Sequence, residues 1–305
     1  MSVVQQLAER YREIIPELDR FMDYATRPPR SVAWRNPLAV SKDELRAWMT
    51  QHCPEAEALG WNEDAWRLPS GARPGLWPIY LAGWVYVQDE TSLLAGTMLG
   101  AQPNERILDL CAAPGGKSVR AATLMNDSGT LIANDMNGGR LVALRRAFER
   151  MLITCAAVTH GNGLKYPMDE GGFDRVIADV PCTCEGTSRK QRLRPVNASD
   201  NFRSSINQTQ KGLLRRALKL CKPGGVVLYA TCTYDPAENE MVIDAARVAA
   251  DFDIEPLELH ASITHSPGVT RWHNKRLRDD LVNAVRLYPH QNDSGGFFFA
   301  CLRKL

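Results

Sequence analysis

The chain has 305 residues, of which 44% are hydrophobic and 24% charged, and its formal net charge is +2. This length and composition suffice to bury one large core, or a medium domain beside a small one. No apolar run reaches the roughly 20 residues of a membrane span, and the N-terminus is polar, so neither a signal peptide nor a transmembrane helix is predicted. The nearly balanced charge identifies no partner by itself.

Eight cysteines without a secretory signal indicate a reducing compartment, and we expect the protein in the cytoplasm. Cys182 and Cys184 resemble half of a metal site, but no second close pair or Cys/His cluster supplies four ligands, so no metal is expected. Five cysteines stand singly among apolar neighbours and are interpreted as core residues: Cys53, Cys111, Cys155, Cys221 and Cys301.

The first 75 residues predict a small α+β domain followed by a linker. We expect an amphipathic helix over 3–19, an extended stretch over 31–34, and a helix that begins at Ser41 with Glu44 completing a capping box. Residues 69–75 are rich in turn formers and are typical of a linker. The larger predicted domain therefore covers 76–305.

After Pro103 the sequence alternates between strands, Gly/Pro turns and helices, which predicts βαβ units and a mostly parallel sheet. The fold class expected is α/β, a Rossmann-like sheet closed by a C-terminal antiparallel hairpin. The predicted strands cover 106–110, 130–134, 173–178 and 226–230; the helices begin at Lys117 or cover 139–151, 210–221 and 238–249; the hairpin covers 281–287 and 296–302.

Four chemically interesting residues fall at or just beyond the predicted strand ends: Asp109, Asp135, Asp179 and Cys232. In open sheets of this kind, ligands bind beyond the carboxyl ends of the strands. We therefore expect the functional site there.

The segment 109–118, Asp-Leu-Cys-Ala-Ala-Pro-Gly-Gly-Lys-Ser, joins a strand to a helix. Its small residues let the backbone approach a ligand in front of a helix N-terminus. It matches neither G-x-G-x-x-G nor a P-loop, which weakens a phosphate-binding interpretation. Asp135 at the next strand end is suited to both hydroxyls of a ribose. Each feature alone is compatible with a tight turn or a surface acid, but together they indicate an adenosine-containing cofactor.

This segment and the motifs around it resemble the RNA cytosine-C5 methyltransferase family over nearly the whole chain. The further motifs are 88–92 (Gln-Asp-Glu-Thr-Ser), 179–186 (Asp-Val-Pro-Cys-Thr-Cys-Glu-Gly), 230–234 (Ala-Thr-Cys-Thr-Tyr) with 238–240, and Pro289-His290 before 296–298. The resemblance implies S-adenosylmethionine as cofactor and a class I methyltransferase fold.

The resemblance also implies roles for individual residues at the cofactor site. Asp135 would hold the ribose, Asp179 would lie against the methyl donor and the target base, and Asn162 aligns with an acid that contacts adenine. An asparagine carbonyl can still accept from the adenine amino group. The residues implied to wrap the methionine part are Cys111, Ala112, Ala113, Pro114, Gly115, Gly116 and Lys117.

C5 of cytosine is too weak a nucleophile to take a methyl group directly, so the chemistry requires a cysteine that first adds to C6. The residues alone do not order the two candidates, Cys182 and Cys232. DNA cytosine methyltransferases use the Pro-Cys cysteine, which favours Cys182, whereas the RNA family uses the Thr-Cys cysteine. The resemblance therefore implies Cys232 as nucleophile and Cys182 in product release, with Asp179 near N3 and N4 of the base. It also places Lys117 near the cofactor and the base.

Thr183-Cys184 departs from the Ser-Gly or Thr-Gly that is usual in the family after Pro-Cys, and we interpret Cys184 as incidental. Candidate phosphate contacts are the basic stretch 189–194, the cluster 271–278, and Arg27, Arg30 and Arg35. The nearest resemblance favours ribosomal RNA over transfer RNA, and we expect a monomer. Two competing interpretations are a methyltransferase of the same fold acting on a small molecule or DNA, and an RNA-binding assembly factor with a relic site.

Overall fold

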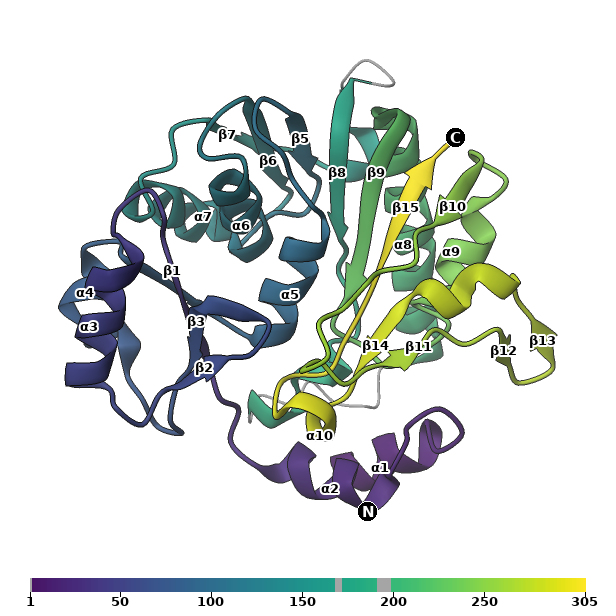
Figure 1. Ribbon diagram of the computed structural model, residues 1–305. Coiled ribbons are helices and arrows are strands. Elements are labelled where there is room, and N and C mark those ends of the chain that lie inside the picture. Colours follow the sequence, from purple (N-terminus) through teal and green to yellow (C-terminus); the bar gives the residue numbers. More distant parts are fainter. Residues whose placement is uncertain (1, 168–171, 191–198) are drawn as a thin grey trace.

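A computed structural model of the chain describes residues 2–167, 172–190 and 199–305. Within these residues the strands form a nine-stranded main sheet, a four-stranded N-terminal sheet and a two-stranded hairpin (Figure 1). The helices described are all too short or too polar to cross a membrane.

Five parallel strands form one half of the main sheet, in the order β7-β6-β5-β8-β9. The strand order reverses between β5 and β8, because the chain runs outward from β5 in one direction and then returns to add β8 and β9 on the other side. Such a switch point opens a crevice at the carboxyl ends of the strands. The bounds are β5 (Arg106–Asp109), β6 (Thr130–Asp135), β7 (Ala156–His160), β8 (Phe173–Asp179) and β9 (Cys221–Thr231).

Helices cover both faces of this sheet, because successive side chains along each strand point to opposite faces. Val227 belongs to the hydrophobic cluster that includes residues of α8 and α9, whereas its neighbour Leu228 belongs to the cluster that includes residues of α5, α6 and α7. The same alternation holds for Ile107 and Leu108 in β5. The Rossmann-like α/β class predicted from the sequence is confirmed. The helices are α5 (Glu90–Met98), α6 (Gly116–Leu124), α7 (Gly138–Arg150), α8 (Asp200–Leu220) and α9 (Glu240–Ala246).

The other half of the main sheet is antiparallel and comes from the C-terminal part of the chain. Strand β15 pairs with β9, β14 and β10, and β14 pairs with β11. The predicted closing hairpin is confirmed in the pairing of β14 with β15, but its connection contains helix α10 rather than only a polar turn. The bounds are β10 (Phe252–Ile254), β11 (Ser266–Pro267), β12 (Arg271–Trp272), β13 (Lys275–Arg276), β14 (Val285–Leu287), α10 (Pro289–Asn292) and β15 (Phe297–Lys304).

The N-terminal sheet is antiparallel, in the order β2-β3-β1-β4. The capping box of Ser41 and Glu44 is present at the start of α3, as predicted. Strand β4 lies beyond the predicted boundary at residue 75, so the small sheet draws one strand from the region assigned to the larger domain. The division at residue 75 itself stays a prediction. The bounds are β1 (Val32–Arg35), α3 (Lys42–His52), β2 (Glu57–Leu59), β3 (Asn62–Arg67), α4 (Pro78–Leu81) and β4 (Val85–Gln88).

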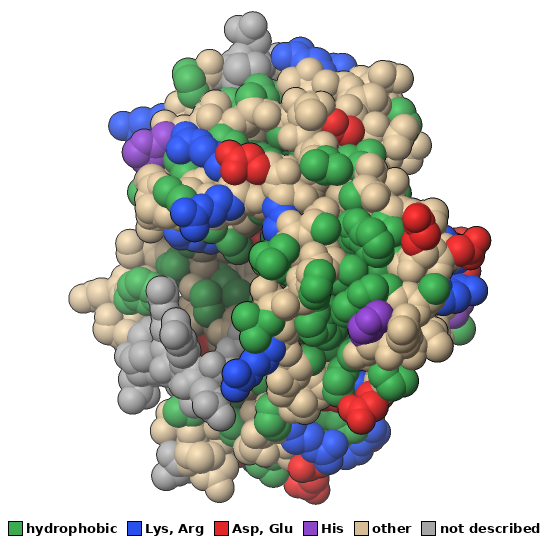
Figure 2. Space-filling view, turned by 90° about the vertical axis from the view of Figure 1, so that its left-hand side faces the viewer, with side chains coloured by type: hydrophobic (Ala, Val, Ile, Leu, Met, Phe, Trp, Pro, Cys, Tyr) green, Lys and Arg blue, Asp and Glu red, His purple; other side chains and the backbone are tan. Residues whose placement is uncertain are grey.

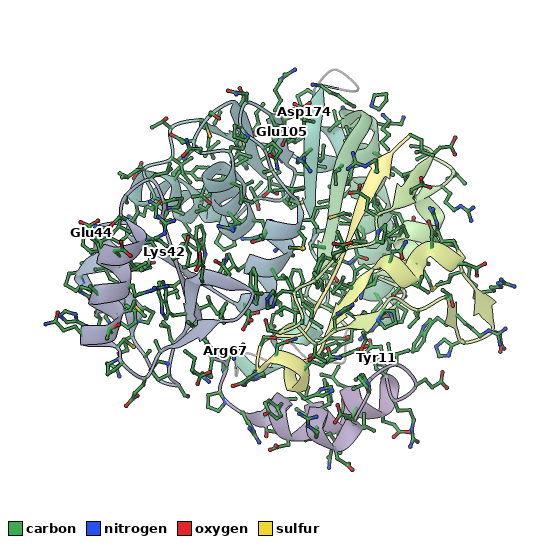
Figure 3. All side chains as sticks on the ribbon, in the orientation of Figure 1. Tyr11, Lys42, Glu44, Arg67, Glu105 and Asp174 are labelled. Carbon is green, nitrogen blue, oxygen red and sulfur yellow. The ribbon has the colours of Figure 1, made fainter. Side chains whose placement is uncertain are left out.

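The single helix predicted over 3–19 is wrong, because the chain forms α1 (Val3–Arg10) and α2 (Leu18–Thr26) instead. Pro16 has no backbone N–H and restricts the residue before it, and Glu17 adopts a left-handed φ of 47°. Tyr11 and Phe21 from this segment pack edge-on against Tyr234 beyond β9 (Tyr11 is labelled in Figure 3). The two helices therefore lie on the C-terminal half of the molecule (Figure 1).

Two further helix boundaries differ from the prediction. Helix α8 begins ten residues earlier than expected, at Asp200, because the Ser199 side chain accepts a hydrogen bond from the N–H of Phe202 and caps a first half that is too polar to show periodicity. Helix α9 covers only Glu240–Ala246 instead of 238–249.

Charged side chains pair with one another at the amino edge of the parallel strands. At the amino edge, Glu105 accepts a hydrogen bond from Arg175 at 2.7 Å and Asp174 accepts one from Lys222 at 2.7 Å (Figure 3). Ion pairs therefore occupy the amino edge.

On the α3–α4 side, Figure 2 shows a broad group of hydrophobic side chains beside a hollow; Leu81 of α4 is 68% exposed.

A buried ion pair between Arg286 of β14 and Glu240 of α9 fixes the antiparallel half on the sheet, with side chains 2% and 0% exposed. Arg286→Met leaves the Glu240 carboxylate buried without its partner, so we expect a loss of about 3–5 kcal/mol in the free energy of unfolding. Arg303→Met is the control, since its pair with Glu255 is exposed and should contribute less than about 1 kcal/mol. Urea unfolding of both variants measures the difference, and equal losses would contradict the prediction.

Candidate functional site

The predicted site residues meet at the carboxyl edge of the parallel strands. Asp109, Asp135 and Asp179 are the last residues of β5, β6 and β8, and Cys232 directly follows β9. Because these strands are neighbours in the sheet, the loops that follow them face one crevice.

The loop after β5 is held by hydrogen bonds to Asp109 at the end of β5 and to Asn134 of β6. Asp109, which is 1% exposed, accepts from the N–H of Cys111 at 3.3 Å and from the hydroxyl of Ser118 at 2.6 Å. The N–H of Ala112 donates to the carbonyl of Asn134 at 2.8 Å. The backbone from Cys111 to the start of α6 is therefore fixed before any ligand binds.

The end of this loop forms a bare backbone surface in front of α6. Gly115 has a φ of +116° and begins α6 without a side-chain cap. A Cβ at Gly116 would lie 2.3 Å from Oε1 of Gln88, so a side chain there would require the Gln88 amide to move. Both polar atoms of the Gln88 amide are buried without a hydrogen-bond partner. Buried polar groups are rarely left unpaired, so this region is suited to a polar ligand.

Asp135 contributes to the same loop from β6. It is 3% exposed, and its two carboxylate oxygens accept from the N–H groups of Ala113 at 3.1 Å and Asn137 at 2.8 Å. Each oxygen keeps a second lone pair for a ligand. The next residue, Met136, has an apolar side chain that is 68% exposed, and no role was predicted for it from the sequence.

Asn162 lies after β7, the strand beside β6, and its side chain is exposed. Its side-chain carbonyl accepts a hydrogen bond from the N–H of Leu164 at 2.9 Å. The oxygen that we expect to face an adenine amino group is thus engaged in a local turn, with one lone pair remaining. The adenine contact stays a prediction.

Lys117 and Asp179 connect the loop after β5 with the end of β8. The Lys117 ammonium lies 2.8 Å from Oδ2 of Asp179 and 3.2 Å from the hydroxyl of Ser92, over the ring of Phe297. Lys117 is buried, whereas the Asp179 side chain is 35% exposed. The lysine therefore fixes a carboxylate that still faces the crevice. Ser92 and Phe297 were not assigned a role by sequence, although both belong to the motifs that carry the resemblance.

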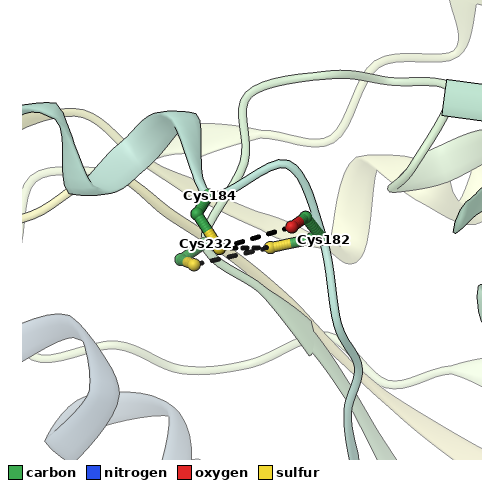
Figure 4. Close-up of side chains that lie close together, drawn as sticks. All are labelled: Cys182, Cys184 and Cys232. Carbon is green, nitrogen blue, oxygen red and sulfur yellow. Dashed lines mark hydrogen bonds between the residues drawn. The ribbon is translucent and has the colours of Figure 1, made fainter. Parts of the chain in front are cut away.

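The fold brings together three cysteine sulfurs, shown in Figure 4. Sγ of Cys182 lies 3.4 Å from Sγ of Cys232 and 3.8 Å from Sγ of Cys184. The loop after β8 reaches Cys232 because the N–H of Gly186 donates to the Cys232 carbonyl at 2.8 Å. A Cβ at Gly186 would lie 2.1 Å from the carbonyl oxygen of Gly296, so this close approach requires glycine. Cys232 thus joins Cys182 and Cys184 in one cluster of three sulfurs.

The sulfur contacts determine the protonation of these cysteines. Contacts with Cys184 and Cys232, together with burial, hold the pKa of Cys182 well above its ordinary value. The hydrogen bond with Cys182 lowers the pKa of Cys232, but the contact with Cys184, burial and the charge of Asp179 outweigh it, and the net pKa is raised. This arrangement therefore favours the thiol form of both groups over the thiolate at neutral pH.

Glu238, just before α9, positions the loop that carries Cys182 and Cys184. It is 2% exposed and accepts from the N–H of Thr183 at 3.0 Å, from the Thr183 hydroxyl at 2.5 Å and from the Gln210 amide at 2.7 Å. Burial raises the pKa of Glu238. Glu238 belongs to the motif 238–240, but its partner Thr183 lies 55 residues away and could not be predicted from the sequence.

Several basic residues predicted to contact phosphates have structural partners instead. Arg189 is 3% exposed and donates to the carbonyls of Arg27, Pro28 and Ser294 and to Asp293. The Arg189 guanidinium therefore donates its hydrogen bonds to groups within the protein. Residues 191–194 of the same stretch lie outside the described residues. Arg30 and Arg35 are half-buried in ion pairs with Glu57 and Asp64.

Part of the second predicted basic cluster is exposed. Arg271, Lys275 and Arg276 lie on the surface of the β12–β13 hairpin. This hairpin borders a cavity of about 740 Å³ that combines cationic and aromatic side chains. Its lining includes Arg10, Tyr11, Arg203, Trp272, His273 and Lys275.

Burial raises the pKa of Asp109 to about 7, although the Ser118 hydrogen bond acts in the opposite direction. The unfolded chain ionises this aspartate near pH 4, so between about pH 4 and 7 the folded state binds more protons. The free energy of unfolding should therefore fall as pH rises, by up to about 1.4 kcal/mol per pH unit. Urea unfolding at pH 5–8 should show this slope in the wild type and not in Asp109→Asn.

Ser118→Ala provides the second arm of this test. It removes the hydrogen bond that favours the charged form of Asp109, so the decline in stability should extend to higher pH. Identical pH profiles for the wild type and Asp109→Asn would refute the assignment of this titration.

Comparisons with known proteins agree with this geometry. The sequence model of the family described as 16S rRNA methyltransferase RsmB/F matches residues 96–303. The chain is 31% identical over 305 residues to the tRNA (cytosine(49)-C(5))-methyltransferase of Pyrococcus abyssi, covering 99% of the chain and 97% of that relative. It is 33% identical over 297 residues to the human 28S rRNA (cytosine(4447)-C(5))-methyltransferase, covering 95% of the chain but 36% of the human protein.

A solved structure of a methyltransferase homolog from Pyrococcus horikoshii has a TM-score of 0.85 at 28% identity, covering 99% of this chain and 95% of that one. The chain thus spans nearly the whole of the archaeal relatives and well under half of the human one. Because the family model covers most of the chain and includes the four strand ends that form the site, the chain belongs to the 16S rRNA methyltransferase RsmB/F family, and its resemblance to RNA cytosine-C5 methyltransferases is confirmed.

Proposed function

We propose that this chain is an S-adenosylmethionine-dependent RNA (cytosine-C5)-methyltransferase that forms 5-methylcytidine. The observation that carries the proposal is the 3.4 Å approach of the Cys182 and Cys232 sulfurs at the strand-end crevice, close to the carboxylate of Asp179. Two cysteines from two different loops suit a reaction that needs one group to attack the base and another to help release the product. The archaeal and human relatives are both named as cytosine-C5 methyltransferases.

The residues present fit S-adenosylmethionine, which when bound supplies an electrophilic methyl group. The uncapped N-terminus of α6 and the unpaired Gln88 amide suit the charged amino-acid end of the cofactor. Asp135 retains lone pairs for the ribose hydroxyls, and Met136 offers an apolar face for the adenine, with Asn162 beside it. The loop residues proposed to contact the cofactor are Cys111, Ala112, Ala113, Pro114, Gly115, Gly116 and Lys117.

The chemistry proposed for the cysteines proceeds in three steps. The Cys232 thiolate forms a bond to C6 of the cytosine, and the displaced electron pair makes C5 nucleophilic. C5 then takes the methyl group. The C5 proton then passes to a base or to water, its electron pair restores the C5–C6 double bond, and the bond from Cys232 to C6 breaks to release the Cys232 thiolate, with the assistance of Cys182. Asp179, which Lys117 holds in place, is suited to hydrogen-bond the base near N3 and N4.

The solvent exposure of the two side chains supports the roles proposed for Cys182 and Cys232, which the sequence alone left open. Cys182 is 6% exposed, whereas Cys232 is half-buried. The sulfur that adds to a base must be reached by that base, so the more accessible Cys232 suits the nucleophile. The sulfur of the more deeply buried Cys182 lies 3.4 Å from that of Cys232.

For the RNA, we propose a path over the β12–β13 hairpin and the cavity beside it. Nucleic acids are held by cations that contact phosphates and by aromatic rings that stack on bases. Lys275 and Arg276 supply exposed charge, and His273 supplies an exposed ring that lies against the buried Trp272, with ring centroids 4.3 Å apart. We further propose that the protein acts as a monomer in the cytoplasm. Ribosomal RNA is the favoured substrate and transfer RNA the alternative.

The covalent step predicts a trapped adduct. In the presence of RNA, S-adenosylmethionine and EDTA, Cys182→Ala should accumulate a protein–RNA species on a denaturing gel, because addition to C6 still occurs while release is impaired. Cys182→Ala/Cys232→Ala should form none, and the matched control Cys182→Ala/Cys155→Ala should still form it. An adduct in the double variant without Cys232 would overturn the assignment of the nucleophile.

The substrate class is tested in cells. Bisulfite sequencing of total RNA should show that a small set of cytosines becomes unprotected when the protein is removed, and that the wild type but not Cys232→Ala restores protection. The RNA that carries these cytosines identifies ribosomal or transfer RNA as the target. An unchanged methylation pattern, together with absence of any adduct in vitro, would favour a non-catalytic assembly factor.

A further inference from the structure

The third cysteine of the cluster in Figure 4 has no part in the chemistry proposed above. Cys184 lies in the loop after β8, and its sulfur is 3.8 Å from Sγ of Cys182. The sulfurs of Cys182, Cys184 and Cys232 all lie within 4.8 Å of one another. We propose that these three thiols form a zinc-binding site, and that zinc held there excludes methyl transfer.

The spacing of the sulfurs fits a tetrahedral zinc ion. Zinc–thiolate bonds of about 2.3 Å at tetrahedral angles separate the sulfurs by about 3.8 Å. The Cys182–Cys184 separation is 3.8 Å and the Cys182–Cys232 separation is 3.4 Å. The third separation, at most 4.8 Å, needs to shorten by no more than about 1 Å. Three protein ligands leave the fourth position open to water.

The backbone of Cys184 indicates that its thiol is held toward the cluster at a cost. Its φ is +59°, in the left-handed region that residues with a Cβ rarely adopt. The conformation is fixed on both sides, since Glu238 anchors Thr183 and the N–H of Thr187 donates to the Cys184 carbonyl at 3.0 Å. Strained residues of this kind occur at ligand sites more often than elsewhere.

The chemistry of the ligands selects a soft ion, and the site is accessible to it. Thiolates prefer zinc to magnesium or calcium. Cys184 and Cys232 are half-buried rather than enclosed, so an ion can enter from their side. Binding replaces three thiol protons, which pass to solvent, and no atom changes oxidation state. Because one of the three ligands is Cys232, occupancy removes the sulfur that would add to cytosine; this consequence rests on the proposed function, whereas zinc binding does not.

Metal binding is tested directly on the full chain, purified metal-free in a non-thiol reductant. Titration with Co²⁺ should give visible d–d bands and thiolate-to-cobalt charge-transfer bands that saturate at one ion per chain and vanish when Zn²⁺ is added. Cys184→Ser should weaken zinc affinity at least about a hundredfold, because even a residue outside the ligand shell contributes ten- to a hundredfold. Cys155→Ser, a half-buried cysteine outside the cluster, should leave the affinity unchanged.

Inhibition is the second measurement. Zinc should abolish methyl transfer by the wild type, EDTA should restore it, and Cys184→Ser should keep most of its own zinc-free rate at the same zinc concentration. Equal zinc affinity in the wild type and Cys184→Ser, or a cobalt spectrum without thiolate bands, overturns the site. Absence of methyl transfer in every sample would refute the proposed function while the cobalt titration still decides the metal site.

Discussion

The site depends on one backbone hydrogen bond, from the N–H of Gly186 to the carbonyl of Cys232. It joins the loop after β8 to the end of β9, and Gly186 in turn accepts from the N–H of Gly296 at the start of β15. A side chain at position 186 would displace these contacts, since its Cβ would lie 2.1 Å from a carbonyl oxygen. Cysteines 50 residues apart thereby come within contact distance. The buried carboxylate of Glu238 keeps the same loop in register by accepting two hydrogen bonds from Thr183.

A second connection couples the proposed cofactor loop to the reacting groups. Lys117 belongs to the first turn of α6, yet its ammonium contacts Asp179 at the end of β8. The lysine is buried and the aspartate is only partly so, which means that the charge pair sits at the boundary between protein and crevice. Charged groups in such a setting interact more strongly than in bulk water. A ligand bound at the loop after β5 would therefore affect, through Lys117, the position and charge environment of the Asp179 carboxylate, which is proposed to hold the base.

The N-terminal residues are integrated with the rest of the molecule rather than appended to it. Tyr11 and Phe21 pack against Tyr234, only two residues from Cys232, and the buried Asn36 amide donates to the carbonyls of Gly83 and Met151 at 2.9 Å each. Strand β4 closes the small sheet from beyond the predicted linker. The side chains that face the C-terminal half thus shape the surroundings of the site as well as the surface proposed to meet RNA.

The sequence by itself determined the α/β class, the four strand ends that carry the site, and the family, because these follow from local periodicity and from short contiguous motifs. The capping box of Ser41 and Glu44 could also be predicted from the sequence, since its two partners are three residues apart. Tertiary structure decided what depends on partners distant in the chain: the contact of Cys184 with the other two sulfurs, the role of Glu238, and the burial of Arg189 among backbone carbonyls. The local sequence around an arginine does not show whether its side chain faces solvent or carbonyl oxygens. For Arg189, this is decided by the packing of segments that lie a hundred or more residues apart in the chain.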